Sequence, residues 1–261
     1  MNKIALAPTS LPDSPPLEYV HAAGKAGYTA IGLRVFRSPG VNYPFYPIVD
    51  DPNLARDVKK AIADYGIEVV DVLSFYILPE MDFDAMMKPL EYAKELGATY
   101  ALVIGDDDEW GRATENFGKF CDITKSFDLI TAIEAPVVSR KINKLEKAVK
   151  LVKDSGRDNA VICLDPMQFF RVGDTADMLI GADPKLYPYT QITDGPQTGP
   201  RSALGEGVAP MYGILDNLMP EIPLSLEWPA PVGSNYTPDE WAKFALEGCK
   251  TYLNTYYASK K

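Results

Sequence analysis

Short apolar runs recur along this chain at intervals of about thirty residues, and an amphipathic stretch follows each of them. The runs are continuous more than alternating, which is typical of parallel strands buried on both faces. We therefore predict eight strands, which cover residues 4–7, 30–35, 68–73, 100–104, 129–133, 160–164, 187–192 and 223–226.

Helical patterns occupy the intervals between these runs. Pro15 and Pro16 open the first pattern, and Gly27 and Gly66 follow the first and second, as expected for helix starts and ends. The predicted helices cover residues 15–26, 52–65, 82–96, 111–127, 142–155, 175–180, 208–217 and 239–256.

Eight strands that alternate with eight helices in 261 residues indicate an α/β protein, a single closed (β/α)8 TIM barrel. A doubly wound open sheet is the competing architecture, but eight near-equal units without a phosphate-loop motif favour the barrel. No Ser/Gly linker or block of charge divides the sequence, so we expect one domain over residues 1–261.

Composition narrows the function classes. The formal net charge of −10 argues against binding to nucleic acid or to an anionic membrane surface, and no apolar run is long enough for a membrane helix. The three cysteines are far apart and the first ten residues do not form a signal peptide, so we expect free thiols and a cytoplasmic location. The single histidine, His21, lies in a predicted helix, where we expect a packing or surface role.

Oxygen-donating side chains end four consecutive predicted strands: Glu134, Asp165, Gln191 and Glu227. In a TIM barrel these strand ends and the loops after them form the active-site face, and two such loops, residues 36–50 and 193–208, are long here. Alternate residues of a strand share a face. If that face is the barrel interior, the four side chains converge at its mouth.

Three converging carboxylates would repel one another in a partly desolvated site, and a divalent cation removes that repulsion. Two Glu, one Asp and one amide oxygen suit Mn²⁺ or Mg²⁺ better than Zn²⁺. The competing interpretation, that each acidic residue only caps the next helix, is weaker for four neighbouring strands. We predict one divalent metal, Mn²⁺ or Mg²⁺ with Co²⁺ or Zn²⁺ as alternatives, held by Glu134, Asp165, Gln191 and Glu227.

Further short motifs surround these residues. They are Leu96-Gly97-Ala98, Gly105-Asp106-Asp107-Asp108, the segment 165–173, Gln191-Ile192-Thr193-Asp194-Gly195, Arg201 and Gly205-Glu206-Gly207. With these motifs in this order, the sequence resembles the xylose isomerase-like TIM-barrel superfamily, often described as sugar phosphate isomerases and epimerases. The resemblance covers essentially the whole chain and implies the same four metal ligands.

Two positions depart from the pattern of that superfamily. The ligand on the seventh strand is more often histidine than the Gln191 found here, although a branch that includes dehydroshikimate dehydratases is similar in using glutamine. Many relatives also have a histidine where this chain has Gln168. Because that histidine commonly contacts the substrate or the metal shell, its absence argues against assigning the reaction of any one relative to this chain.

Carboxylates are the acid/base groups expected at the mouth, since the sequence offers no histidine there, no activated serine motif and no cysteine–histidine pair. No predicted strand ends in lysine, which argues against a Schiff-base aldolase. A metal on a carbonyl or hydroxyl oxygen stabilises an enediolate, and a flanking carboxylate then moves the carbon-bound proton. Resemblance to the epimerases implies that Glu134 and Glu227 are the catalytic pair. We therefore expect an isomerase or epimerase that acts on a ketose, a keto-sugar or a cyclic polyol.

Arginines near the strand ends are candidates for substrate binding, although any of them could instead pair with the acidic run 106–108. The predicted substrate-binding residues are Arg34, Gln168, Arg171, Arg201 and Glu206. Two other functions stay open. Gln191 favours a metal-dependent lyase of the dehydroshikimate dehydratase type, which Gln168 argues against, and the lack of histidines favours a non-catalytic barrel subunit. The resemblance also implies a homo-oligomer.

Overall fold

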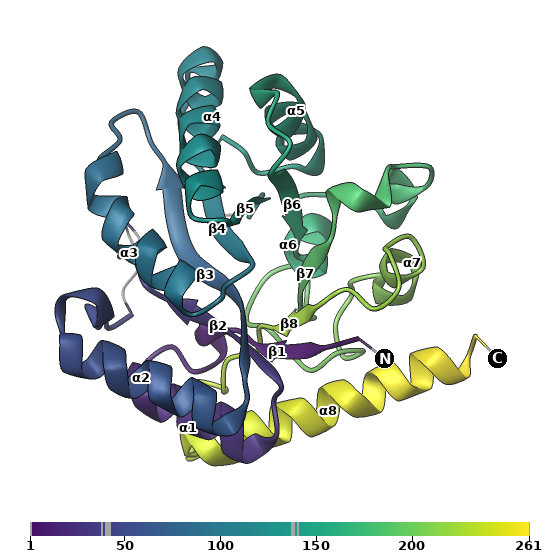
Figure 1. Ribbon diagram of the computed structural model, residues 1–261. Coiled ribbons are helices and arrows are strands. Elements are labelled where there is room, and N and C mark those ends of the chain that lie inside the picture. The colour runs from purple at the N-terminus through teal and green to yellow at the C-terminus, as the bar shows by residue number, and fades with distance from the viewer. Residues whose placement is uncertain (1, 38, 40–42, 137–138, 140, 261) are drawn as a thin grey trace.

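Eight parallel strands form a closed barrel in chain order in the computed structural model, which describes residues 2–37, 39, 43–136, 139 and 141–260. Each strand pairs with its neighbours in sequence, and β8 pairs with β1 to close the barrel (Figure 1). The strands are β1 (Ile4–Leu6), β2 (Ala30–Arg34), β3 (Glu68–Ile77), β4 (Tyr100–Gly105), β5 (Ile130–Glu134), β6 (Ala160–Leu164), β7 (Tyr189–Ile192) and β8 (Leu224–Leu226). The predicted (β/α)8 barrel is confirmed.

Helices surround the barrel. They are α1 (Pro16–Ala26), α2 (Pro52–Tyr65), α3 (Phe83–Glu95), α4 (Trp110–Ser126), α5 (Leu145–Ser155), α6 (Pro166–Arg171), α7 (Met211–Leu215) and α8 (Pro238–Ala258), with 3-10 turns η1 (Pro8–Ser10), η2 (Ile48–Asp50), η3 (Ala176–Leu179) and η4 (Pro184–Leu186). Gly66 ends α2 with φ of 63°, a left-handed conformation that glycine adopts at little cost.

Three predicted elements differ clearly from the structure. The helix predicted at residues 208–217 covers only Met211–Leu215. The helix predicted at residues 175–180 is wrong, because this segment forms only the 3-10 turn η3 and the helix after β6 is α6, directly behind Asp165. Asp165 directly follows β6 and caps α6, since its carboxylate accepts hydrogen bonds from the backbone N–H groups of Met167 and Gln168. Strand β3 also continues to Ile77, beyond the predicted end at residue 73.

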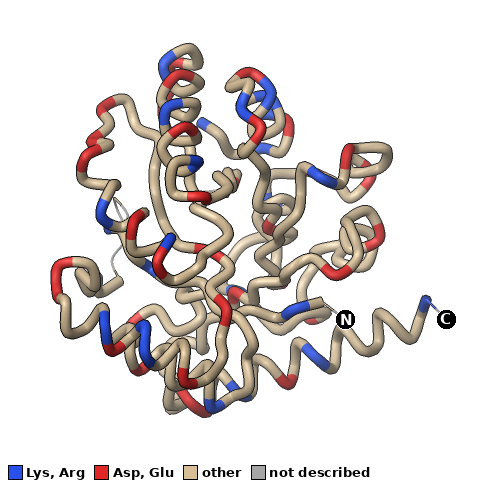
Figure 2. The backbone as a smooth tube through the Cα atoms, in the orientation of Figure 1, with Lys and Arg blue, Asp and Glu red and all other residues tan. Residues whose placement is uncertain are grey.

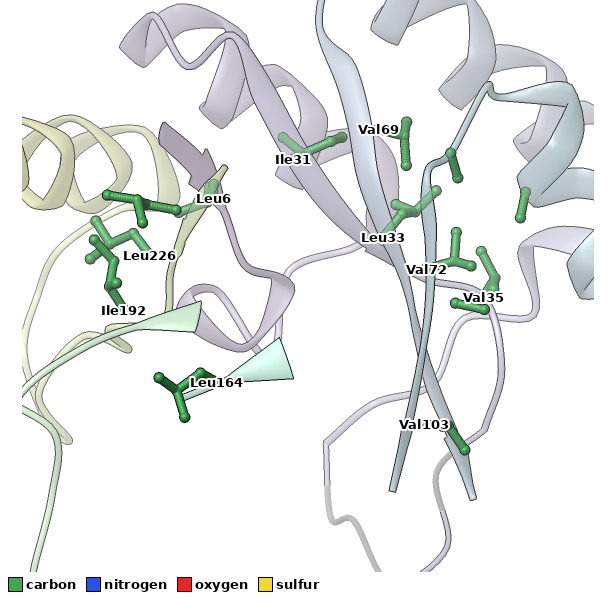
Figure 3. Packing of buried hydrophobic residues seen from close by; sticks show 14 of the residues in the cluster. Leu6, Ile31, Leu33, Val35, Val69, Val72, Val103, Leu164, Ile192 and Leu226 are labelled. Atoms are coloured by element: carbon green, nitrogen blue, oxygen red, sulfur yellow. The ribbon is translucent and has the colours of Figure 1, made fainter. Parts of the chain in front are cut away.

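Apolar side chains pack in two layers. Outward-facing residues such as Leu6, Ile31 and Leu226 fill the space between the strands and the helices (Figure 3). Inside the barrel lies a second cluster, in which the rings of Tyr100 and Tyr189 stack with centroids 5.1 Å apart. The other buried members of this inner cluster are Ala5, Ala30, Val70, Leu73, Leu102, Ala132 and Cys163. The two tyrosines thus occupy a lumen whose other walls include several small residues.

Charged residues of both signs are distributed over the outer helices (Figure 2). The three cysteines, Cys121, Cys163 and Cys249, are buried free thiols. Among the described residues, no helix combines the length and apolar character needed to span a membrane.

Candidate active site

Four strand ends bring Glu134, Asp165, Gln191 and Glu227 to one end of the barrel. Glu134 is the last residue of β5, Gln191 belongs to β7, and Asp165 and Glu227 directly follow β6 and β8. The strand register aligns Leu164 with Thr190, so the next residues, Asp165 and Gln191, are neighbours. All four are buried, with exposed fractions of 7%, 3%, 2% and 8%.

Arg201, in the loop after β7, connects two of these carboxylates. Its Nη1 lies 3.0 Å from Oδ2 of Asp165, and its Nη2 lies 3.0 Å from Oε1 of Glu227. The arginine side chain is only 13% exposed. A buried guanidinium with two carboxylate partners offsets part of the repulsion between them. Removing the guanidinium or a carboxylate would leave a buried charge without its partner and would destabilise the fold.

The loop that carries Arg201 is held by its own backbone contacts. The carboxylate of Asp194 accepts hydrogen bonds from the backbone N–H groups of Gly195, Gly205 and Ala209. Ser202 donates its backbone N–H to the Asp194 carbonyl oxygen at 2.8 Å. These bonds tie both ends of the loop to one residue beside β7, which positions Arg201 over the strand ends.

Burial dominates the electrostatics of the two glutamates. It raises the pKa of Glu227 to about 7, against the lowering effect of Arg201. Burial, together with the charges of Glu227 and Asp165, raises the pKa of Glu134 well above its usual range. Burial alone would lower the pKa of Arg201, but the charges of Glu227 and Asp165 outweigh it and raise the pKa.

The donor set fits a hard divalent cation in its chemistry. Three carboxylates and one amide supply oxygen donors only, and the buried Oε1 of Gln191 has no hydrogen-bond partner among the described residues. An orphaned amide oxygen of this kind is costly unless a ligand satisfies it. Within the described residues, no three Asp, Glu, His or Cys side chains are already arranged as a metal cage. Arg201 holds Asp165 and Glu227 in this structure.

The other predicted substrate-binding residues lie in different surroundings. Arg34 ends β2, and Gln168 lies in α6, where its backbone N–H bonds to Asp165. The Arg171 guanidinium donates to the carbonyl oxygens of Pro196 and Gly199 and so braces the Arg201 loop. Glu206 is exposed in that loop.

The acidic run has partners other than these arginines. Asp107 forms two hydrogen bonds of 2.7 Å with Arg112, and Asp108 pairs with Lys141. Arg34, Arg171 and Arg201 therefore do not pair with Asp107 or Asp108.

Tyr76 is a residue of the mouth that the sequence analysis missed. The register aligns Tyr76 with Ile104 and Ile104 with Glu134, so the three side chains share one face across β3, β4 and β5. Burial first, and then the charges of Glu134 and Asp106, raise the pKa of Tyr76. The signal was the apolar triplet Phe75-Tyr76-Ile77, which continues β3 past Ser74.

A buried carboxylate lies deeper in the barrel. Oδ2 of Asp71 accepts a 2.6 Å hydrogen bond from the Tyr189 hydroxyl, and Oδ1 has no partner among the described residues. Burial raises the pKa of Asp71 to about 6, against the lowering effect of Tyr189. This pair lies beside Tyr100 in the lumen, beneath the strand ends.

Replacing Tyr189 with phenylalanine should lower the free energy of unfolding by about 1–3 kcal/mol at pH 7.5, because the buried Asp71 carboxylate loses its donor. The loss should shrink toward pH 5, where Asp71 is protonated in the folded protein. Urea unfolding measures both effects. Tyr100→Phe is the matched control, since its hydroxyl makes only a 3.4 Å contact with the Pro188 carbonyl oxygen. Equal losses in the two variants would contradict this role of Tyr189.

Comparisons with known proteins agree with this architecture. A family model described as a xylose isomerase-like TIM barrel matches residues 20–252. The IolI protein with a bound zinc atom is 18% identical, has a TM-score of 0.79, and the match covers 97% of this chain and 99% of that one. An L-ribulose 3-epimerase is 17% identical, has a TM-score of 0.74, and the match covers 100% of this chain and 97% of that one.

A xylose isomerase-like TIM barrel/4-hydroxyphenylpyruvate dioxygenase fusion protein is also similar, with 17% identity and a TM-score of 0.74. That match covers 95% of this chain, which spans only 42% of the fusion protein. No curated protein sequence matches the chain. At these identities the similar structures show a shared fold. Because the family model covers most of the sequence and the barrel is closed, the chain belongs to the xylose isomerase-like TIM-barrel family.

Proposed function

We propose that this protein is a divalent-metal-dependent isomerase or epimerase that acts on a ketose, a keto-sugar or a cyclic polyol. The observation that carries the proposal is the set of four buried oxygen donors on consecutive strand ends, one of which, Gln191 Oε1, has no partner among the described residues. Epimerase relatives, such as the L-ribulose 3-epimerase, support the same class of reaction.

Glu134, Asp165, Gln191 and Glu227 would hold the metal, with Mn²⁺ or Mg²⁺ favoured by the oxygen-only donor set. Zn²⁺ is also a candidate, because the IolI structure contains a zinc atom. Co²⁺ is a further candidate. Such an ion, when bound, polarises the substrate oxygen next to the reacting carbon.

The two glutamates supply the proton transfers. One of the two glutamates, as a carboxylate, takes the proton from the carbon beside the carbonyl group, which leaves an enediolate. The other glutamate, as a protonated carboxyl group, returns a proton to the opposite face, so that the configuration changes and no atom is gained or lost. Arg201 orients Glu227 through its ion pair.

Substrate contacts would come from the same side of the barrel. Arg201 and Gln168 lie next to Asp165 and are our candidates for the substrate hydroxyl groups. Glu206 and Arg171 lie in or against the Arg201 loop, and we propose that they act mainly by positioning it. We further propose that the protein acts as a single-domain barrel in the cytoplasm and forms a homo-oligomer.

The reaction class is tested by incubating the Mn²⁺-loaded protein with a panel of ketoses and keto-polyols and following the products by carbon-13 NMR. An isomer of the added compound supports the proposal. Loss of water from the compound would instead indicate the lyase alternative, which the relatives do not support. If no compound is changed, the proposal fails and the non-catalytic alternative gains weight.

Gln191→Leu should weaken Mn²⁺ binding roughly tenfold or more, because a metal ligand is lost. The free energy of unfolding in EDTA should stay equal or rise, since the variant removes a buried amide whose oxygen has no partner. Calorimetric titration with Mn²⁺ and urea unfolding measure the two quantities. Unchanged Mn²⁺ affinity would remove Gln191 from the proposed site.

A further inference from the structure

Arg34 ends β2 at the mouth of the barrel, at about the level of the carboxylate cluster. Leu6 of β1 pairs with Ile31 on one side and with Leu226 on the other, which relates the register of β2 to that of β8. Glu227 follows Leu226 by one residue and Arg34 follows Ile31 by three. The strands of a closed eight-stranded barrel are staggered by about one residue per strand, so this offset across two strands places Arg34 at about the level of Glu227.

The guanidinium of Arg34 has no carboxylate partner among the described residues. Its one hydrogen bond there is a long contact of 3.5 Å from Nη1 to the Pro12 carbonyl oxygen, and its charge lies 5.3 Å from the centre of the Tyr43 ring. Arg201, by contrast, has two carboxylates at 3.0 Å. Arg34 is therefore the arginine of the mouth that keeps most of its hydrogen-bonding capacity.

The surroundings of Arg34 are partly dry. Burial lowers the pKa of Arg34, and the smaller, opposing effects of Tyr43, Tyr19, Asp13 and Glu227 do not fully offset this lowering. A guanidinium in such a place is stabilised by an anion that can accept several of its hydrogen bonds.

A cavity of 30 Å³ lies beside this side chain. Its walls come from the segment after β1, from α1, from the end of β2 and from the stretch around Pro44 and Tyr46. Among the described lining residues, Arg34 is the only charged one. A space of this size accommodates roughly one oxygen-sized group, such as part of a carboxylate or phosphate.

We propose that Arg34 binds an anionic oxygen group of the substrate, so that the substrate is an acidic sugar or polyol, carboxylated or phosphorylated, and not a neutral ketose. This inference rests on the proposed function, which defines the reacting end of the substrate. The anionic group lies on the β2 side of the mouth, and the reacting carbon lies between the two glutamates. Arginine suits this task because its planar fork matches carboxylate and phosphate oxygens.

The test is calorimetric titration of the Mn²⁺-loaded protein with three compounds that differ at one carbon: D-fructose, D-fructuronate and D-fructose 6-phosphate. We expect at least one of the two acids to bind ten or more times more tightly than D-fructose. Which acid binds distinguishes a carboxylate from a phosphate. Arg34→Gln should abolish the preference, and Arg34→Lys should keep part of it.

Arg37→Gln is the matched control, because Arg37 is also in the loop region after β2 but packs on the exposed side against Phe45. It should keep the full preference for the acid. The inference is overturned if neither acid binds more tightly than D-fructose, or if the preference survives in Arg34→Gln. Isomerisation of D-fructose without any acid preference would overturn this inference alone, whereas acid preference without isomerisation of any compound would overturn only the proposed function.

Discussion

Replacing Arg201 with leucine should lower the free energy of unfolding by about 3–5 kcal/mol at pH 7.5 in EDTA, because buried carboxylates would lose their counter-charge. Asp165 and Glu227 each lie 3.0 Å from this guanidinium, and its charge also lowers the pKa of Glu134. Urea unfolding of the wild type and the variant gives the difference directly.

The effect should depend on pH in a defined direction. The folded pKa of Glu227, about 7, lies above its ordinary value of 4.5, so the folded protein binds more protons than the unfolded chain between these values. Stability from this group is therefore present at low pH and is lost as pH rises toward 7. Without Arg201 the folded pKa rises further, and the deficit of Arg201→Leu should be smaller at pH 5 than at pH 7.5.

Arg157→Leu is the control for Arg201→Leu. Arg157 also makes two hydrogen bonds of 2.8 Å to one carboxylate, that of Asp122, but this pair is largely exposed. Exposed ion pairs contribute about 1 kcal/mol or less, so the control should stay near the wild type. A deficit for Arg201→Leu no larger than that of the control would contradict the electrostatic account of the mouth.

Glu134→Gln and Glu227→Gln should each reduce the rate of proton exchange between substrate and solvent by about 10²–10⁴-fold, the usual contribution of a general acid or base. Each change keeps the shape of the side chain and removes its capacity to carry the proton. The rate is measured by NMR with the substrate that the panel of ketoses identifies.

Glu115→Gln serves as the control, because Glu115 is exposed on α4 and pairs only with Lys119 among the described residues. It should leave the exchange rate unchanged. If either Glu134→Gln or Glu227→Gln retains more than a tenth of the wild-type rate, that residue is not an acid or base in the reaction. Mn²⁺ titration of the same variants separates loss of the metal from loss of the proton carrier.

The barrel could be predicted from the sequence because its determinants are local. Continuous apolar runs define buried parallel strands, and glycines such as Gly66 end the helices between them. The helix after β6 is an exception. The dipeptide Asp165-Pro166 ends β6 and starts α6 at once, so the helix lies where the sequence analysis expected only a strand end followed by a loop.

The candidate site could be predicted only in part. The strand-end donors follow from the periodicity of the barrel, since each lies at a fixed place in its repeat. Contacts between residues far apart in sequence do not follow from this periodicity. Arg201 and Asp165 are 36 residues apart, and Tyr189 and Asp71 are 118 residues apart. These contacts depend on the closed barrel and on the loop held by Asp194. Tyr76 was missed for a different reason, the underestimated length of β3.

The most direct test of the proposed proton transfer is deuterium incorporation from D₂O into a panel of neutral, carboxylated and phosphorylated ketoses, followed by proton NMR with the Mn²⁺-loaded protein. We expect loss of the proton signal at the carbon beside the carbonyl group, both in the recovered substrate and in its isomer, with no change at other carbons. Absence of deuterium from every compound, with about one metal ion bound per chain, would contradict a reaction in which Glu134 and Glu227 move this proton.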